Sequence, residues 1–281
     1  MKDKLVANKI ETWHQEDDTL GYRKLAVLME VNHKKARRIM HKYGLKARRQ
    51  PKAYKYPGKS STVYPNLPKD EALVPWVEFV FSDIFEFKLR DGTKVRGCFA
   101  LLKKTRQVLS LVFDYSMRAT LVVDTIERID FVDSMTVFHT DQGKQFGAKI
   151  TYEAQMKKGF LLSMSRAGTP TDNPFAERFA GLFKLAVVKR YSYATLGNFL
   201  EQAERWVNFY NQTRPHEGLE QLSPNQFALQ NNYPSVPYLP LFSCTNFGEL
   251  DTQQQTKKAA WFSHPDRGLP FTHSKKGCCC T

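Results

Sequence analysis

The chain has few cysteines, and none of them has the spacing of a zinc site. Its 281 residues include five cysteines: Cys98, Cys244 and the run Cys278–Cys280. No Cys-x-x-Cys or Cys/His pattern occurs, and three adjacent cysteines cannot easily wrap one ion tetrahedrally. We therefore expect an incidental cysteine tail and a chain that works in a reducing, cytosolic compartment.

Long apolar runs are also missing. The N-terminus lacks the apolar run of about 7–15 residues that a signal peptide needs. No segment reaches the roughly 18 apolar residues of a membrane span. The sequence therefore predicts no membrane partner, while a content of 42% hydrophobic and 13% aromatic residues allows a packed core.

Acidic residues are absent from Val31 to Lys69, where twelve Lys and Arg residues occur. The whole chain carries 42 Lys+Arg against 28 Asp+Glu, a net charge of +14. Prolines interrupt this basic region, so a helix cannot persist through it. We expect an extended basic linker over residues 46–74 that contacts nucleic acid, because a run of one charge repels itself unless something neutralises it. A solvated tether is the alternative.

Residues 1–45 have the pattern of a small helical module. Leu25, Leu28 and Met29 have helical spacing, with a cap expected among residues 17–19, and a second helix runs from a capping Asn32 to Gly44. Two short helices around a tight turn predict a helix-turn-helix. The expected DNA-contacting side chains of this module and the start of the linker are Lys34, Lys35, Arg37, Arg38, Arg48 and Arg49.

Residues 75–192 alternate strand-like and helical segments in the order β-β-β-α-β-α-β-α. The first strands are rich in aromatic and β-branched residues, and an Asp-Gly pair at residues 91–92 marks a hairpin. This order predicts a mixed α/β layer fold. We expect a post-core helical extension over residues 193–232 and an irregular tail over residues 233–281.

Three carboxylates stand out in this order. Asp83 lies in the middle of the first strand, Asp141 ends the fourth, and Glu177 starts the last core helix after Asn173 and Pro174. A charge inside an apolar strand is costly unless it is paired or binds metal, and open α/β sheets place ligands at the carboxyl ends of their strands. If the first and fourth strands are neighbours and the helix packs beside them, the three carboxylates converge.

Converging carboxylates repel one another unless a cation lies between them. Oxygen ligands suit Mg²⁺ or Mn²⁺, and two such ions support an in-line phosphoryl displacement without a protein nucleophile. Each residue also has a structural explanation: a strand-edge charge for Asp83, a turn former for Asp141 and a helix-dipole partner for Glu177.

The motifs around these carboxylates resemble a known family. Between Asp141 and Glu177 lie 35 residues, which matches the Asp-Asp-35-Glu signature of retroviral-type integrases and transposases. The segments HTDQGKQF, SMSRAGTPTDNPFAERFAGLFK and FYNQTRPHEGL resemble boxes of the second-reading-frame transposase of the IS-three family of bacterial insertion sequences. The first box departs from the pattern, with Phe85 where Thr is usual.

The resemblance implies an RNase H-like, five-stranded core with flanking helices over residues 75–192. It implies Asp83, Asp141 and Glu177 as catalytic ligands of two Mg²⁺ or Mn²⁺ ions that cleave DNA and transfer strands at element ends. It also implies a bacterial, cytoplasmic and nucleoid-associated protein that acts as a homo-oligomer on double-stranded DNA, with an upstream-frame DNA-binding partner protein.

Further residues are expected near the DNA. Lys184 matches the family's Lys seven residues after the Glu and shares a helix face with Glu177. His139, on the same side of its strand as Asp141, contacts DNA, orients Asp141 or is structural. Arg214 contacts DNA or locks the helix beyond the core. A catalytically decayed transposase, a DNA-binding regulator and an RNase H-type nuclease without strand transfer stay open as alternatives.

Overall fold

The computed structural model describes residues 2–49, 63–68, 77–130, 136–166, 169–239 and 241–243. These residues all belong to one compact unit, residues 1–244. Most of the predicted linker and most of the predicted tail, with Cys244 and Cys278–Cys280, lie outside the described residues.

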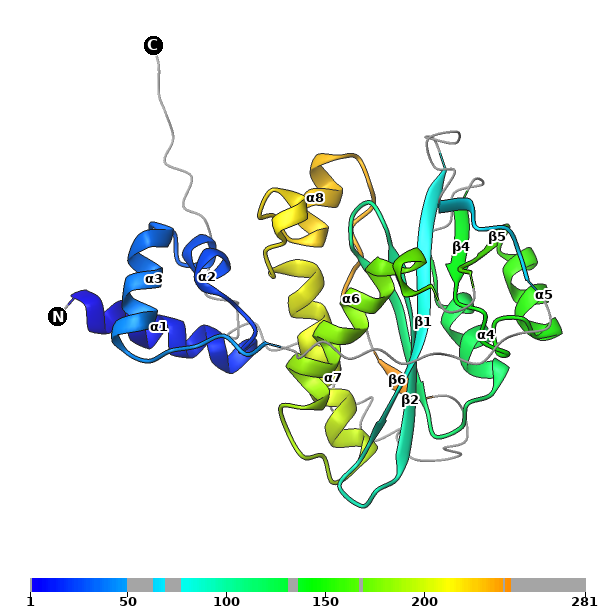
Figure 1. Ribbon diagram of the computed structural model, residues 1–281, viewed down its shortest axis with the longest axis horizontal. Coiled ribbons are helices and arrows are strands. Elements are labelled where there is room, and N and C mark those ends of the chain that lie inside the picture. The colour runs from blue at the N-terminus through cyan, green and yellow to red at the C-terminus, as the bar shows by residue number, and fades with distance from the viewer. Residues whose placement is uncertain are drawn as a thin grey trace, which may run out of the picture. The chain divides into compact units, whose positions relative to one another are not determined.

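Three helices form the N-terminal part of the chain: α1 (Lys2–Glu16), α2 (Tyr22–Leu28) and α3 (His33–Lys42) (Figure 1). The predicted start and end of α3 are confirmed, because the Asn32 side chain accepts a hydrogen bond from the Lys34 N–H at 2.8 Å and Gly44 has a φ of +68°. The predicted cap of α2 is wrong. Its N-cap is Gly21, without a side-chain cap, because Asp17 instead accepts hydrogen bonds from Thr19.

A six-stranded mixed sheet forms the centre of the molecule, in the order β5-β4-β1-β2-β3-β6. β1, β2 and β3 form an antiparallel meander, β4 lies parallel to β1, and β5 lies parallel to β4. The predicted Asp-Gly hairpin joins β1 to β2, with Gly92 at a φ of +86°. The strands are β1 (Glu78–Lys88), β2 (Lys94–Leu102), β3 (Val108–Asp114), β4 (Thr136–Thr140), β5 (Leu161–Met164) and β6 (Phe242–Ser243).

The five predicted strands and their flanking helices are confirmed, with the strand order of an RNase H-like core. β6, which pairs in parallel with the edge of β3, is an addition from the region predicted as an irregular tail. That region begins in an ordered way, since the Leu239 N–H donates to Asn208 Oδ1 at 2.7 Å and Leu241 is buried.

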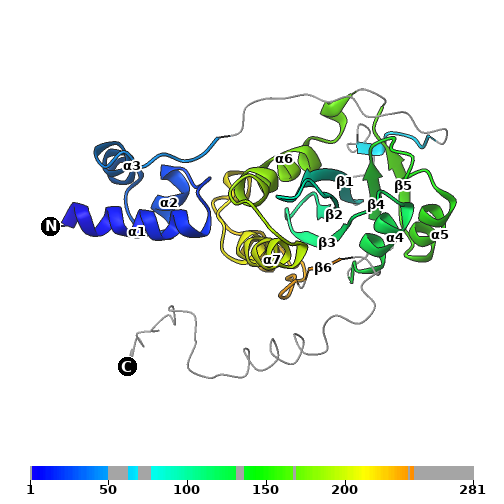
Figure 2. The ribbon, with the colours of Figure 1, turned by 90° about the horizontal axis from the view of Figure 1, so that it is seen from below.

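Helices cover both faces of the sheet (Figure 2). Hydrophobic residues of α6 (Pro174–Phe183), of a π-helix (Lys184–Val188) and of α7 (Leu196–Gln212) pack on one face, and those of α4 (Ala119–Glu127) and α5 (Lys149–Lys157) pack on the other. A further helix, α8 (Pro224–Gln230), follows α7 and packs against it.

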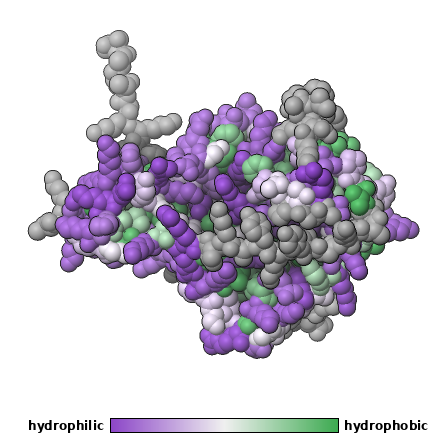
Figure 3. All heavy atoms as spheres, viewed as in Figure 1, coloured by the Kyte–Doolittle hydropathy of each residue, from purple (hydrophilic) through white to green (hydrophobic). Residues whose placement is uncertain are grey.

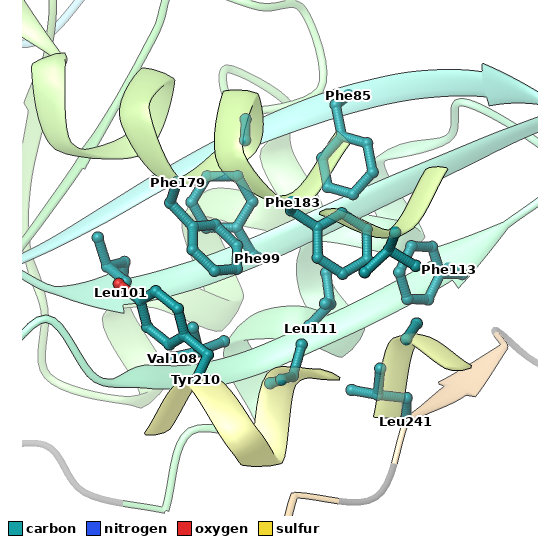
Figure 4. Packing of buried hydrophobic residues seen from close by; sticks show 14 of the residues in the cluster. Phe85, Phe99, Leu101, Val108, Leu111, Phe113, Phe179, Phe183, Tyr210 and Leu241 are labelled. Atoms are coloured by element: carbon teal, nitrogen blue, oxygen red, sulfur yellow. The ribbon is translucent and has the colours of Figure 1, made fainter. Parts of the chain in front are cut away.

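The α6 face holds a core of aromatic rings (Figure 4). Phe179 lies 4.7 Å from Phe99 and Phe183 lies 5.3 Å from Phe85 between ring centroids. Phe199 and Tyr210 of α7 belong to the same cluster. α7, which we predicted as an extension beyond the catalytic core, packs on the sheet because its apolar face completes the aromatic layer that α6 begins.

Candidate active site

Asp83 lies on the aromatic face of β1. Side chains alternate along a strand, so Asp83 shares its face with Phe81 and Phe85, which are 1% and 2% exposed. Its carboxylate accepts a hydrogen bond from the Ile84 N–H at 2.7 Å. A carboxylate between two buried phenylalanines in the middle of a central strand has no structural explanation in the packing of the sheet.

Asp141 directly follows β4, and the pairing of β4 with β1 aligns it with Asp83. Phe81 pairs with His139 in the parallel β1–β4 ladder, and two residues further along each strand lie Asp83 and Asp141. The Asp141 carboxylate accepts a hydrogen bond from the Gly143 N–H at 2.9 Å. A Cβ on Gly143 would lie 3.0 Å from the same carboxylate oxygen, so a glycine fits this turn best. The predicted neighbourhood of the first and fourth strands is confirmed.

Glu177 is brought to the same region by the start of α6. Asn173 is the N-cap residue, as predicted, but its side chain does not cap the helix. Its amide instead donates to the carbonyl of Ser82 at 3.1 Å, next to Asp83. Pro174 occupies the first turn as predicted. Glu177, one turn into the helix, is exposed.

The pKa of Asp83 is affected by both of the other carboxylates. Burial, together with the charges of Asp141 and Glu177, raises the pKa of Asp83 to about 7, and Lys184 and the hydrogen bond from Ile84 oppose the rise. Burial also raises the pKa values of Asp141 and Glu177. All three carboxylates have raised pKa values, and a cation bound between them would favour their charged forms.

Lys184 lies where α6 gives way to the π-helix. The Lys189 N–H donates to the Lys184 carbonyl at 2.8 Å, five residues back. The Lys184 ammonium lies 5.4 Å from the centroid of the Phe85 ring, on the face that carries Asp83. Single turns of π-helix occur mostly inside α-helices and often at functional sites.

The donor set fits a hard divalent cation, because it consists of carboxylate oxygens alone. Asp83 and Asp141 each direct one oxygen to a backbone N–H. Within the described part of the chain, no three Asp, Glu, His or Cys side chains stand close enough to hold an ion as now arranged. Asp83, Asp141 and Glu177 are the carboxylates of this region that would hold such an ion.

His139 does not face DNA, in contrast to one of its predicted roles. It is fully buried, and its ring nitrogens lie 2.8 Å from Ser163 Oγ and 3.1 Å from Ser165 Oγ. Burial lowers its pKa to about 4, so the ring is neutral. His139 joins β4 to β5 two residues before Asp141.

Arg214 is also buried, so the prediction that it contacts DNA is wrong. Its guanidinium donates to Asp17 at 2.8 Å and to Thr19 at 3.2 Å, and its side chain is 4% exposed. Arg190 donates to the carbonyls of His14 and Gln15, both at 2.7 Å. The alternative role is the one that fits: Arg214 locks the segment after α7 to the end of α1.

The basic residues of α3 differ in how they are engaged. Arg38 forms an ion pair with Asp3 at 2.9 Å, and Arg48 forms one with Asp18 at 2.6 Å. Hydrophilic residues cover this part of the surface (Figure 3). A groove there is lined by Tyr22, Arg23, His33, Lys34, Arg37, Arg38 and His41.

Lys34, Arg37 and Arg49 are exposed, and Lys35 is half-buried. Their predicted contact with DNA stays a prediction.

Sequence reasoning missed two residues that organise the region, Asn66 and Asp172. Asp172 is 8% exposed and accepts a hydrogen bond from the Asn66 amide at 2.7 Å. The signal in the sequence was the Asp-Asn pair before Pro174, interpreted only as the start of the helix. The partner of Asp172 lies 106 residues away in the chain, beyond the reach of local patterns.

Two family models, both described as an integrase core domain, match this chain, one over residues 78–170 and the other over residues 158–224. Together they span β1 to β5, α6 and α7. The chain belongs to the integrase core family.

Its relatives are proteins of bacterial insertion elements. The chain is 27% identical over 234 residues to an uncharacterized 31.7 kDa protein of insertion element IS407 from Burkholderia multivorans, covering 81% of each chain. It is 26% identical over 243 residues to the putative transposase InsK of element IS150 from Escherichia coli, covering 80% of this chain and 83% of the relative. The predicted class, an insertion-sequence transposase of the integrase superfamily, is confirmed.

Solved structures with low sequence identity include a simian T-cell lymphotropic virus intasome in complex with a PP2A regulatory subunit, with 16% identity, a TM-score of 0.48 and coverage of 82% of this chain and 77% of that chain. The HTLV-2 integrase catalytic core domain in complex with magnesium has 15% identity, a TM-score of 0.43 and coverage of 53% of this chain and 94% of that chain. Among the described helices of this chain, none is long and apolar enough to cross a membrane.

Proposed function

We propose that this chain is a transposase of the IS-three type that cleaves DNA at the ends of an insertion sequence and transfers the strands to a target. Asp83, Asp141 and Glu177 are the catalytic carboxylates, and they hold two Mg²⁺ or Mn²⁺ ions. The observation that carries the proposal is the placement of Asp83 between two buried phenylalanines, at the register position of Asp141.

Each part of the chain has a role in this reaction. When bound, such ions would supply Lewis-acid assistance to the displacement at the phosphodiester. Asp83 and Asp141 fix the position of the ions from the rigid sheet, while Glu177 closes the site from α6. Lys184 binds a DNA phosphate beside the site. No side chain of the protein is needed as the nucleophile, because bound metal ions support an in-line displacement by water or a 3′-hydroxyl.

DNA is held mainly through its phosphates. The exposed cations of α3, including Lys34 and Arg37, bind the double-stranded element ends together with Arg49 at the start of the linker. The protein acts as a homo-oligomer on paired ends, assisted by an upstream-frame DNA-binding protein. It works on the DNA of the bacterial nucleoid.

The test is a nicking and joining assay on linear DNA that carries the inverted repeats flanking the element. The variants Asp83→Asn, Asp141→Asn and Glu177→Gln abolish both products in Mg²⁺ while DNA binding stays close to that of the wild type. Glu201→Gln, an exposed glutamate of α7, is the matched control and keeps full activity. Nicking that survives Glu177→Gln would show that the ligand assignment is wrong.

The same assay separates the alternatives. A DNA-binding regulator or a decayed transposase binds the ends and produces no nick in either metal. A nuclease without strand transfer nicks the DNA and produces no joined product.

A further inference from the structure

Residues 65–67, within the predicted linker, are fastened to β5. The Met164 N–H donates to the Pro65 carbonyl at 3.2 Å, and the Leu67 N–H donates to Ser163 Oγ at 3.0 Å. Ser163 Oγ in turn donates to the Pro65 carbonyl at 2.9 Å. Residues 65–67 therefore lie along the outer edge of the sheet, and we call them the linker clip.

Ser163 extends this connection to β4. Its single hydroxyl proton is given to Pro65, so the oxygen accepts from Leu67 and from His139 Nδ1, which lies 2.8 Å away. On the other side of the ring, His139 Nε2 lies 3.1 Å from Ser165 Oγ, whose hydroxyl donates to the Thr140 carbonyl of β4 at 3.2 Å. The linker clip is thus joined through one serine and one histidine to the strand that ends at Asp141.

Asn66 joins the same clip to the start of α6. Its amide donates to Asp172 Oδ2 at 2.7 Å. The Asp172 carboxylate also accepts from the Arg166 N–H at 3.1 Å and from the Arg166 guanidinium at 3.0 Å. Asp172 is followed by Asn173, whose amide binds the Ser82 carbonyl, and by the helix that carries Glu177.

We propose that the linker clip positions the candidate active site by holding the start of α6 at a fixed distance from β4. Asn66 and Asp172 are positioning residues: they act on Glu177 through the helix and touch no reacting atom. This inference rests on the proposed function of Asp83, Asp141 and Glu177. Asp83 lies in β1 and Asp141 directly follows β4, whereas Glu177 is carried by α6, so its position depends on what anchors the start of α6.

The expected effect is on the metal site rather than on the fold. Loss of a partner that bonds directly to a metal ligand typically costs about 10–100-fold in metal affinity or activity. Asn66 acts one step further away, through Asp172 and α6, so we expect a loss at the lower end of this range. Asn66→Ala removes only the bond from the clip to Asp172. Asn66→Asp keeps the shape but places a carboxylate against a carboxylate, so it is more harmful than alanine. The double variant Asn66→Asp/Asp172→Asn restores a donor opposite an acceptor.

The experiment measures three quantities for each full-length variant: the Mg²⁺ concentration that gives half of the metal-induced rise in Tm, the nicking rate at saturating DNA, and the Kd for DNA. Asn231→Ala is the matched control, because this surface asparagine also donates one amide hydrogen bond, to the Phe227 carbonyl on α8.

We expect Asn66→Ala to raise the half-saturating Mg²⁺ concentration and lower the nicking rate, each by about 10-fold, with an unchanged Kd for DNA. Asn66→Asp should nick more slowly and need more Mg²⁺ than Asn66→Ala. The double variant should nick faster and need less Mg²⁺ than Asn66→Asp. If Asn66 has only a structural role, its variants lower the Tm measured without metal, and the Mg²⁺ requirement and the nicking rate do not follow this order.

Two results overturn the proposal in different ways. If the wild type binds Mg²⁺ and nicks DNA but the Asn66 variants match Asn231→Ala, or if Asn66→Asp equals or exceeds Asn66→Ala, the linker clip does not position the site. If the wild type shows neither a metal-induced rise in Tm nor nicking, the proposed function fails and the inference fails with it.

Discussion

Replacing Asp83 by asparagine should stabilise the metal-free protein at alkaline pH. Asp83 lies between Phe81 and Phe85, and burial together with the Asp141 charge raises its pKa from 3.8 to about 7. The folded state therefore holds a proton on Asp83 that the unfolded chain releases at lower pH. Stability is lost as pH rises from the unfolded to the folded pKa, and asparagine removes this loss.

The magnitude follows from the size of the pKa change. One pKa unit corresponds to about 1.4 kcal/mol, so a rise from 3.8 to about 7 gives an upper limit of about 4 kcal/mol at pH 8. At pH 5 the same reasoning gives a loss of stability of about 2 kcal/mol from the buried carboxylate. The advantage of Asp83→Asn should therefore grow by about 2 kcal/mol between pH 5 and pH 8. The amide oxygen still accepts the hydrogen bond from Ile84, so the local geometry is kept.

The assay is urea unfolding in chelator at both pH values, with Asp130→Asn as the control for an exposed aspartate. Surface changes of this kind stay within about 0.5 kcal/mol. Added Mg²⁺ should raise the free energy of unfolding of the wild type and not that of Asp83→Asn. If Asp83→Asn is no more stable than the wild type at pH 8, and the difference does not grow from pH 5, the carboxylate carries no burial penalty and the reasoning fails.

Three further predictions concern the surrounding structure. Asp17→Ala leaves the buried guanidinium of Arg214 without its ion partner, which should cost about 3–5 kcal/mol in urea unfolding; a change below about 1 kcal/mol would show that the pair is not buried in solution. Because Arg214 and Thr19 hold the pKa of Asp17 below its usual value against the effect of burial, the pair's contribution is present above the unfolded pKa and lost as pH falls through the folded one. Gly97→Ala places a Cβ 2.6 and 2.7 Å from two buried phenylalanine rings and should lower stability by about 1–3 kcal/mol, and an unchanged Tm would contradict the packing. Lys34→Ala with Arg37→Ala should reduce the slope of log Kd for DNA against log salt by about 2, whereas an unchanged slope would place the DNA elsewhere.

Local patterns in the sequence were sufficient for most of the fold. The strands of the sheet follow from β-branched and aromatic runs, and the Asp91–Gly92 pair gave the hairpin. The alignment of Asp83 with Asp141 followed from one assumption, that the first and fourth strands are neighbours, and the ladder from Phe81 to His139 confirms it.

Long-range partners were beyond such reasoning. Arg214 looked like a DNA contact because its buried partner, Asp17, lies 197 residues away. His139 looked like a site residue because the alternation of side chains along a strand predicts only the side on which the ring lies. It does not predict that Ser163 and Ser165 contact the ring there. The order in residues 233–243 was missed because two residues of strand, Phe242–Ser243, make too short a pattern to recognise.

The central claim is that carboxylates from β1, β4 and α6 hold the catalytic metal. The most direct measurement is anomalous scattering from Mn²⁺ in crystals of the protein with DNA ends. The account predicts one or two peaks within about 2.0–2.2 Å of oxygens of Asp83, Asp141 and Glu177, and their loss in Glu177→Gln. A Mn²⁺ peak bound by other residues in a protein that nicks DNA would contradict it.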